Sequence, residues 1–253
     1  MTESIGCVRA DWPAASAVSA LTTTRASGSS VGPWSSLNLA VHVGDEAATV
    51  QRNREHLVRA LDLPAAPQWL DQVHGCEVVR AAVDGVVRTA DAAYTDRTGV
   101  VCAVLTADCL PIAICDRAGR EVAIAHGGWR GLAGGVLRAS VAHFRAPMAE
   151  LLVWLGPAIG PGAFEVGVEV REAFLASALG VEHSAAIDAS FRPLPNGKFL
   201  ADLYSLAGAE CRALGIGSVH GGGFCTYTDA ARVYSFRRDG HTGRMATLIW
   251  INP

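Results

Sequence analysis

The chain has 253 residues, of which 50% are hydrophobic and 18% charged, and its formal net charge is -3. It is long enough to bury a substantial core, and it lacks the basic charge that attracts nucleic acids. No uncharged apolar run of about 18 residues occurs, as a membrane-spanning helix would need. Residues 1–20 carry Glu3, Arg9 and Asp11, where a signal peptide would be apolar. We therefore expect a cytoplasmic, monomeric protein that binds a small molecule, with no nucleic-acid or membrane partner.

The seven cysteines are an odd number without a framework spacing, which predicts free thiols in a reducing compartment. Cys102 and Cys115 lie in apolar runs and are expected to be buried and inert. We find no internal repeat and no low-complexity linker. The segment 27–36 is rich in Ser and Gly, but it contains Trp34 and is predicted to be an ordered loop. A single domain over residues 1–253 is the simplest prediction.

Apolar runs bounded by turn residues predict strands over 100–105, 112–115, 121–125 and 151–155. The spacing of Leu132, Val136, Ala139 and Phe144 predicts a helix over 132–144, and further helices are expected over 168–178 and 201–214. Strands over 233–236 and 246–251 close the chain. This mixture predicts an α/β sandwich with a mixed sheet.

Three polar segments stand out, at 71–75, 106–111 and 125–131, and each presents one reactive residue. His74, Cys109 and His126 together have the composition of a His2Cys metal site, and three protein ligands leave an open position, as catalytic zinc requires. Their separations of 35 and 17 residues are far from zinc-finger spacings. Each stands at the predicted end of an apolar strand, however, where side chains from neighbouring strands can meet.

Cys109 and His126 could equally be a thiolate nucleophile and its general base, with Asp108 or Asp91 as the orienting group. A thiolate bound to zinc is a poor free nucleophile, so the two interpretations exclude each other in one state of the protein. Metal analysis separates them.

Several arginines lie in polar or glycine-containing loops near these segments. Guanidinium groups suit the bidentate capture of phosphate or carboxylate, which makes Arg25, Arg130, Arg237 and Arg238 candidates for anion binding. Arg130 is the strongest of them, because it lies in a Gly-rich turn that opens a predicted helix.

These segments resemble the YfiH-like laccase-domain proteins, also called the polyphenol oxidase or purine nucleoside phosphorylase family of bacteria. The resemblance covers nearly the whole chain and runs through Thr24-Arg25, Ser36-Leu37-Asn38-Leu39, Val43-Gly44-Asp45, Asn53-Arg54, Gln72-Val73-His74-Gly75, Ala90-Asp91-Ala92, residues 106–111, 126–131 and 155–160, Cys225-Thr226-Tyr227 and Ser235-Phe236-Arg237-Arg238. Two departures are visible: the family commonly has Ala where Gly127 stands, and a different loop at 26–30.

The resemblance implies that His74, Cys109 and His126 are the metal ligands and that zinc is the usual metal, with copper able to replace it. It implies a single α/β sandwich, similar also to a necrotizing deamidase toxin that uses a Cys and His pair. The implied activity is phosphorolysis of adenosine, inosine and methylthioadenosine, with adenosine deamination as a second activity. The expected catalytic residues are Cys109, His126 and Asp108, and the expected substrate or phosphate contacts are Arg25, Asn38, Gln72, Arg130, Cys225, Tyr227 and Arg237.

Three alternatives remain at this point. Copper oxidation of phenols needs a second cluster of histidines, and the chain has only eight, without His-x-His pairs. An amidase acting on nucleotide-linked muramyl peptides would use the zinc or the Cys and His pair. A binding protein with a structural zinc would need a fourth ligand, from Cys225 or Asp91.

Overall fold

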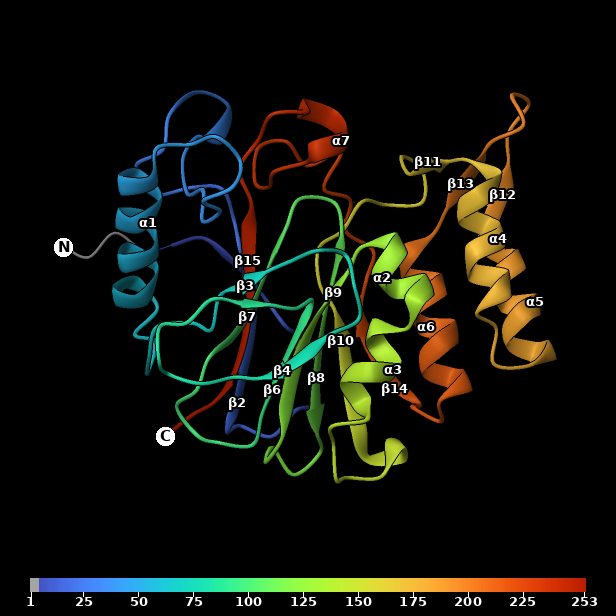
Figure 1. Ribbon diagram of the computed structural model, residues 1–253, viewed down its shortest axis with the longest axis horizontal. Coiled ribbons are helices and arrows are strands. Elements are labelled where there is room, and N and C mark those ends of the chain that lie inside the picture. Colours follow the sequence, from blue (N-terminus) through green and yellow to red (C-terminus); the bar gives the residue numbers. More distant parts are fainter. Residues whose placement is uncertain (1–4) are drawn as a thin grey trace.

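The structure, a computed structural model that describes residues 5–253, packs two β-sheets face to face between helices (Figure 1). The four-stranded sheet has the order β1 (Cys7–Arg9), β2 (Val18–Thr23), β15 (Met245–Ile251) and β7 (Cys102–Thr106). The six-stranded sheet has the order β14 (Ser218–Gly221), β10 (Leu151–Leu155), β8 (Leu110–Asp116), β9 (Val122–Gly127), β6 (Ala92–Thr95) and β4 (Val78–Arg80). The β14–β10 and β4–β6 pairs are parallel and the other pairs antiparallel, so the predicted mixed sheet is confirmed.

Strand β15 shows why the layers form. Leu248 and Trp250 belong to the core under helix α1 (Ala47–Ala60), whereas Ile249 and Ile251 belong to the core between the two sheets. Successive side chains of a strand point to opposite faces, so an apolar strand of this kind must be covered on both sides. The outer face of the six-stranded sheet is covered by α2 (Trp129–Gly134), α3 (Val136–Val141) and α6 (Leu203–Ala213) (Figure 1).

A further lobe lies beyond α6 and contains α4 (Val168–Ala176), α5 (Val181–Ala189) and a small sheet of β11 (Glu165–Val166), β13 (Phe199–Ala201) and β12 (Phe191–Pro193) (Figure 1). The remaining short elements are η1 (Gly32–Trp34), η2 (Met148–Glu150), the pair β3 (Leu70–Asp71) and β5 (Arg88–Thr89), and α7 (Phe236–Asp239). No helix among the described residues is long and apolar enough to cross a membrane.

Most of the predicted elements are confirmed, with two corrections. The predicted helix over 132–144 is two helices, because Gly135 adopts a left-handed φ of 99° between α2 and α3. The predicted strand over 233–236 is wrong, because the Ser235 side chain accepts a hydrogen bond from the Arg238 N–H and starts helix α7. All seven cysteines are free, and Cys102 and Cys115 are buried as predicted.

Candidate metal centre

The structure brings the three predicted ligand residues together. His74 lies in the loop after β3, Cys109 in the turn between β7 and β8, and His126 near the end of β9. Their candidate ligand atoms all lie within 4.8 Å of one another, and the Cys109 Sγ is 3.9 Å from the His74 Nε2. The β8–β9 register explains part of this: it pairs Leu110 with Gly127, which sets Cys109 beside the end of the strand that holds His126.

One buried carboxylate organises two of these ligands. The Asp91 Oδ1 accepts hydrogen bonds from the His126 Nδ1 at 2.8 Å and from the His74 backbone N–H at 2.9 Å. The Oδ2 accepts from the backbone N–H of Gly75 at 2.6 Å. Because His126 donates its Nδ1–H, its Nε2 is left to bind a metal, the arrangement found in carboxylate–histidine–zinc sites. The same bonds hold His74 in a left-handed backbone conformation with a φ of 60°.

Glycines let the ligands approach one another. A Cβ at Gly128 would lie 2.6 Å from the His74 Cδ2, and a Cβ at Gly131 would lie 2.8 Å from the Gly75 carbonyl oxygen. The start of α2 can therefore pack against the His74 loop only without side chains at these positions. At Gly127, where the family commonly has Ala, a Cβ would lie 2.7 Å from the Leu110 carbonyl oxygen, so the glycine fits the close pairing of β8 and β9 at this end of the hairpin.

Cys109 and His126 shift each other's ionisation. Burial alone raises the pKa of the Cys109 thiol, but the charges of His126 and His74 and their hydrogen bonds outweigh it and lower that pKa below its ordinary value. Burial alone lowers the pKa of His126, but Cys109 and Asp91 outweigh it and raise that pKa. The pair therefore favours thiolate and imidazolium when no metal is bound, and the thiolate is the form that binds a metal.

The ligands open into a cavity of about 240 Å³, referred to below as the metal cavity. Its other walls are formed by His42, Gln72, Leu105, Thr106, Ala107, Phe236 and Arg244. Phe236 is 57% exposed, and Val41 and Val73, next in sequence to cavity residues, are also exposed. A cavity of this size takes only part of a drug-sized ligand, so a larger substrate must also cover this apolar rim.

Two of the predicted substrate contacts are tied to backbone groups. The side-chain amide of Gln72 donates to the Leu105 carbonyl at 2.9 Å and accepts from the Leu105 N–H at 2.7 Å, which makes it a wall of the metal cavity. Asn38 is fully buried, and its oxygen accepts from the backbone N–H of Arg244 and of Ala40. Asn38 therefore supports the chain that enters β15.

Asp108, which was predicted to be catalytic, faces the other side of the Cys109 turn. Its carboxylate accepts hydrogen bonds from the Thr226 hydroxyl and from the Arg237 backbone N–H, each at 2.6 Å. The orienting partner of His126 in the structure is Asp91. Asp108 joins three loops, and its own backbone is left-handed, with a φ of 93°.

The predicted arginines do not converge on the metal cavity. Arg25 donates to the carbonyls of Ser35 and Ala230 and lies over the Tyr234 ring. Arg130 is exposed and lies over the Trp129 ring. Arg238 donates to the carbonyls of residues 226, 227 and 233 and braces the loop before α7.

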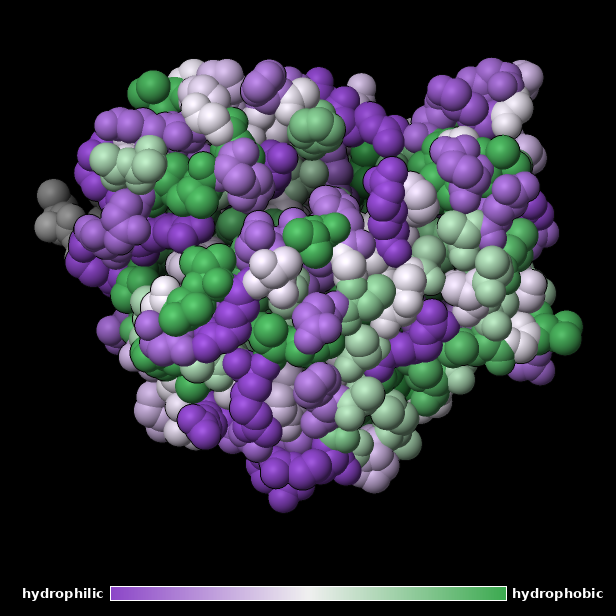
Figure 2. Space-filling model, viewed as in Figure 1, coloured by the Kyte–Doolittle hydropathy of each residue, from purple (hydrophilic) through white to green (hydrophobic). Residues whose placement is uncertain are grey.

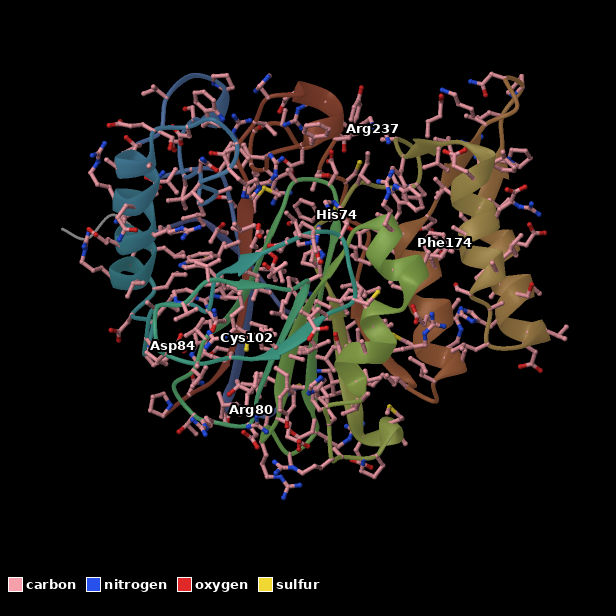
Figure 3. All side chains as sticks on the ribbon, in the orientation of Figure 1. His74, Arg80, Asp84, Cys102, Phe174 and Arg237 are labelled. Carbon is pink, nitrogen blue, oxygen red and sulfur yellow. The ribbon has the colours of Figure 1, made fainter. Side chains whose placement is uncertain are left out.

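Cys225, Tyr227 and Arg237 line a second and larger hollow of about 940 Å³, referred to below as the Cys225 cleft. It lies between α7 and the lobe that contains β11, and a hollow is visible there in Figure 2. Figure 3 shows Arg237 at this position, apart from His74. The Cys225 thiol accepts from the Gly160 N–H at 3.2 Å. Among residues 5–253, the group of metal-binding side chains holds only His74, Cys109 and His126, so neither Cys225 nor Asp91 supplies a fourth ligand.

Sequence reasoning did not assign a site role to six residues of the metal cavity, which are Leu105, Thr106 and Ala107 beside the Cys109 turn, and His42, Phe236 and Arg244. His42 and Phe236 adjoin or belong to segments that carry the family resemblance, but nothing local marks them as cavity residues. Arg244 comes directly before the final strand and has no sequence signal of its own.

Comparisons with known proteins give the family and agree with the fold. A family model described as multi-copper polyphenol oxidoreductase laccase matches residues 19–252. A purine nucleoside phosphorylase of Pseudomonas aeruginosa is 53% identical over 95% of this chain and 96% of its own length. The purine nucleoside phosphorylase YfiH of Escherichia coli is 48% identical, with the same two coverages.

Solved structures give the same result. A crystal structure of a Neisseria meningitidis protein is similar with a TM-score of 0.92 and 47% identity, covering 98% of this chain and 100% of that one. YlmD from Geobacillus stearothermophilus is similar with a TM-score of 0.85 and 31% identity, covering 94% and 93% of the two chains. The chain therefore belongs to the multi-copper polyphenol oxidoreductase laccase family, the YfiH-like laccase-domain proteins.

Proposed function

We propose that this protein is a zinc-dependent purine nucleoside phosphorylase that acts on adenosine, inosine and methylthioadenosine and also deaminates adenosine. The observation that carries the proposal is the convergence of His74, Cys109 and His126 at the end of a small cavity with an apolar rim. The names of the relatives from Pseudomonas aeruginosa and Escherichia coli support the same reaction class. We further propose a cytoplasmic monomer of one domain.

The donor set fits zinc. Two imidazoles and one thiolate are ligands that zinc prefers, and three protein ligands leave a position for water or substrate. The thiolate is favoured before any metal binds, and Asp91 fixes the ring of His126. When bound, zinc supplies Lewis acidity that lowers the pKa of a coordinated water, which suits attack at the purine C6 in deamination.

The chain's own residues bind and orient the nucleoside in this proposal. The exposed ring of Phe236 offers a flat apolar surface on which a purine can stack. Gln72 and Thr106 form the polar walls beside the ligands. Cys225, Tyr227 and Arg237 are candidate contacts for a substrate that reaches past Phe236, since Phe236 and Arg237 are neighbours in α7.

The arrangement of Cys109, His126 and Asp91 favours a second candidate. The Asp91 carboxylate holds the His126 ring, and the ligand atoms of His126 and Cys109 lie within 4.8 Å of each other, so a nucleophile, a base and an orienting carboxylate stand in series. This arrangement suits a cysteine hydrolase, such as an amidase of nucleotide-linked muramyl peptides, when no metal is bound. Multicopper oxidation has less support, because residues 5–253 supply one group of metal ligands and no second cluster.

One experiment separates these functions. Protein with a measured metal content is incubated with adenosine, with and without phosphate, and the products are identified by chromatography. Pentose 1-phosphate that forms only with phosphate supports the phosphorylase, and inosine formed without phosphate supports the deaminase. Phenol oxidation with stoichiometric copper and no nucleoside turnover would contradict the proposal, as would amidase activity that survives complete metal removal.

A further inference from the structure

We infer that Arg244, together with His42 and Thr106, forms a preformed subsite for an inorganic oxyanion such as phosphate, facing the three metal ligands. The inference rests on the proposed function, because it places the co-substrate of phosphorolysis. It moves anion binding away from Arg25, Arg130 and Arg237, where the sequence places it.

One edge of the Arg244 guanidinium is anchored to the backbone, and its Cζ lies over the Phe236 ring, 5.7 Å from the ring centroid. Its Nη1 donates to the carbonyls of Thr242 at 2.9 Å and Gly243 at 3.0 Å, and its backbone N–H donates to Asn38 at 3.0 Å. Its Nε and Nη2 form no hydrogen bond within the part of the chain that the structure describes. An arginine fixed in this way keeps two adjacent donors, the pair that binds an oxyanion in a bidentate manner.

The charges around the metal cavity favour an anion. Its lining contains Arg244, three histidines and no carboxylate, and its one anionic group is the Cys109 thiolate, which is itself a candidate metal ligand. Burial lowers the pKa of Arg244, and the Cys109 thiolate and Asp108 partly oppose that effect. Burial and the charge of Arg244 lower the pKa of His42. An anion beside Arg244 would be attracted to its charge, an attraction that the low local dielectric strengthens, and the His42 imidazole, which lines the same cavity, could donate a hydrogen bond to it.

Thr106 supplies a further polar group. Its side chain lines the metal cavity and is 1% exposed, yet its hydroxyl has no hydrogen-bond partner among residues 5–253. A buried hydroxyl without a partner costs free energy, and a bound ligand or its water would satisfy it. This observation is independent of Arg244 and concerns a residue that lines the same cavity.

The competing arginines lack this combination. Arg25 uses its Nε for the Ser35 carbonyl and its Nη1 for the Ala230 carbonyl, and Arg237 donates to the Glu165 carbonyl in the Cys225 cleft. Arg130 lies on the surface over Trp129. Of all the arginines in residues 5–253, only Arg244 lines the cavity that also holds the metal ligands.

The placement fits the chemistry of phosphorolysis. A phosphate oxygen forms a bond to the sugar C1′ while the C1′–N9 bond breaks. The electron pair of that bond leaves with the purine, and the proton of hydrogen phosphate ends on the purine, so base and pentose 1-phosphate account for every atom. Arg244 would hold the phosphate beside the metal ligands while the purine occupies the rim at Phe236.

The test measures inorganic phosphate binding to the zinc-loaded protein by isothermal titration calorimetry, without nucleoside. Arg244→Met should weaken phosphate binding at least tenfold. Arg244→Lys should weaken binding less, because lysine keeps the positive charge and loses only the pair of adjacent guanidinium donors. Arg192→Met removes an exposed arginine of β12 and should leave binding unchanged. The inference is overturned if the wild type binds no phosphate, if Arg244→Met binds it normally, or if Arg130→Met alone abolishes binding.

Kinetics separate this inference from the proposed function. Arg244→Met should raise the KM for phosphate about tenfold, and it should raise the KM for inosine by a smaller factor, whereas Arg192→Met should change neither KM. If the wild type binds phosphate through Arg244 but yields no pentose 1-phosphate, the proposed function fails and the subsite stands. If the wild type is a phosphorylase and the variant keeps its phosphate KM, the subsite fails. If Arg244→Met does not fold, His42→Gln provides the second test, because His42 is exposed and its substitution should not affect folding. His42→Gln should weaken phosphate binding several-fold.

Discussion

The metal cavity and the Cys225 cleft contain similar residues and differ in how these are arranged. Each holds a cysteine with a lowered pKa, an arginine and an aromatic side chain. For Cys225, burial raises the pKa, and the Thr228 hydroxyl and backbone N–H groups outweigh it. For Cys109, two histidines outweigh burial, and a carboxylate holds one of them. A lowered thiol pKa alone therefore does not identify a metal site; converging ligands and a carboxylate that orients them do.

The largest expected effect comes from removing a ligand. Cys109→Ala and His126→Ala should each abolish stoichiometric zinc binding and reduce nucleoside turnover by more than about 100-fold. This loss should exceed the roughly 10–100-fold loss that follows when only the hydrogen-bond partner of a metal ligand is removed. Cys225→Ala is the matched control and should keep full zinc content. Metal analysis and product chromatography measure both effects. Loss of zinc from Cys225→Ala would contradict the assignment of the metal to the metal cavity and not to the Cys225 cleft.

Asp91→Asn should weaken zinc binding by about 10–100-fold, since its carboxylate accepts from His126 and from the His74 loop. Competition with a chromophoric chelator gives the affinity. Asp188→Asn removes a surface carboxylate paired with Arg171 and should bind zinc normally. Equal zinc affinity in Asp91→Asn and the wild type would show that the carboxylate does not position the ligands.

Thiol reactivity gives a smaller and pH-dependent difference. In metal-free protein, Cys109 should react with iodoacetamide at pH 7, below the ordinary thiol pKa of about 8.5. Because its pKa is lowered, its reactivity should be lost only when the pH falls through that lower value. Zinc should protect Cys109 and leave Cys225 unprotected, as peptide mass spectrometry can measure. Zinc protection of Cys225 would contradict the proposed arrangement.

The smallest effect is expected in the Cys225 cleft. Tyr227→Phe and Arg237→Met should change the KM for inosine by about twofold or less, corresponding to roughly 0.5 kcal/mol, because these side chains would contact only a substrate that extends past Phe236. The backbone N–H of residue 237 still donates to Asp108 in the second variant. A tenfold rise in KM would instead make this cleft part of the substrate site.

The sequence contains local information about this molecule and little about contacts made across the chain. The apolar runs predict β8, β9 and β10, and residue type predicts the His74, Cys109 and His126 group. Asp108 is adjacent to Cys109 in sequence, yet the orienting carboxylate comes from Asp91, because the β6–β9 register sets it beside His126. The sequence cannot show such a register.

The same limit applies to the arginines. Arg25, Arg130 and Arg244 are chemically identical in the sequence, and only their carbonyl and aromatic neighbours distinguish them. The short helix α7 was missed for a related reason, since its N-cap at Ser235 outweighs the strand propensity of residues 233–236. Helix capping determines the structure at α7, and tertiary hydrogen bonds determine which arginine is free to bind a ligand.

The shared carboxylate of Asp91 has a consequence for how the site assembles. Because one oxygen holds both the His126 ring and the His74 backbone, neither histidine can move without loosening the other. We therefore expect metal binding to stabilise both histidines together, so that forms with only one of them in place are sparsely populated. We expect such a site to exchange its metal slowly.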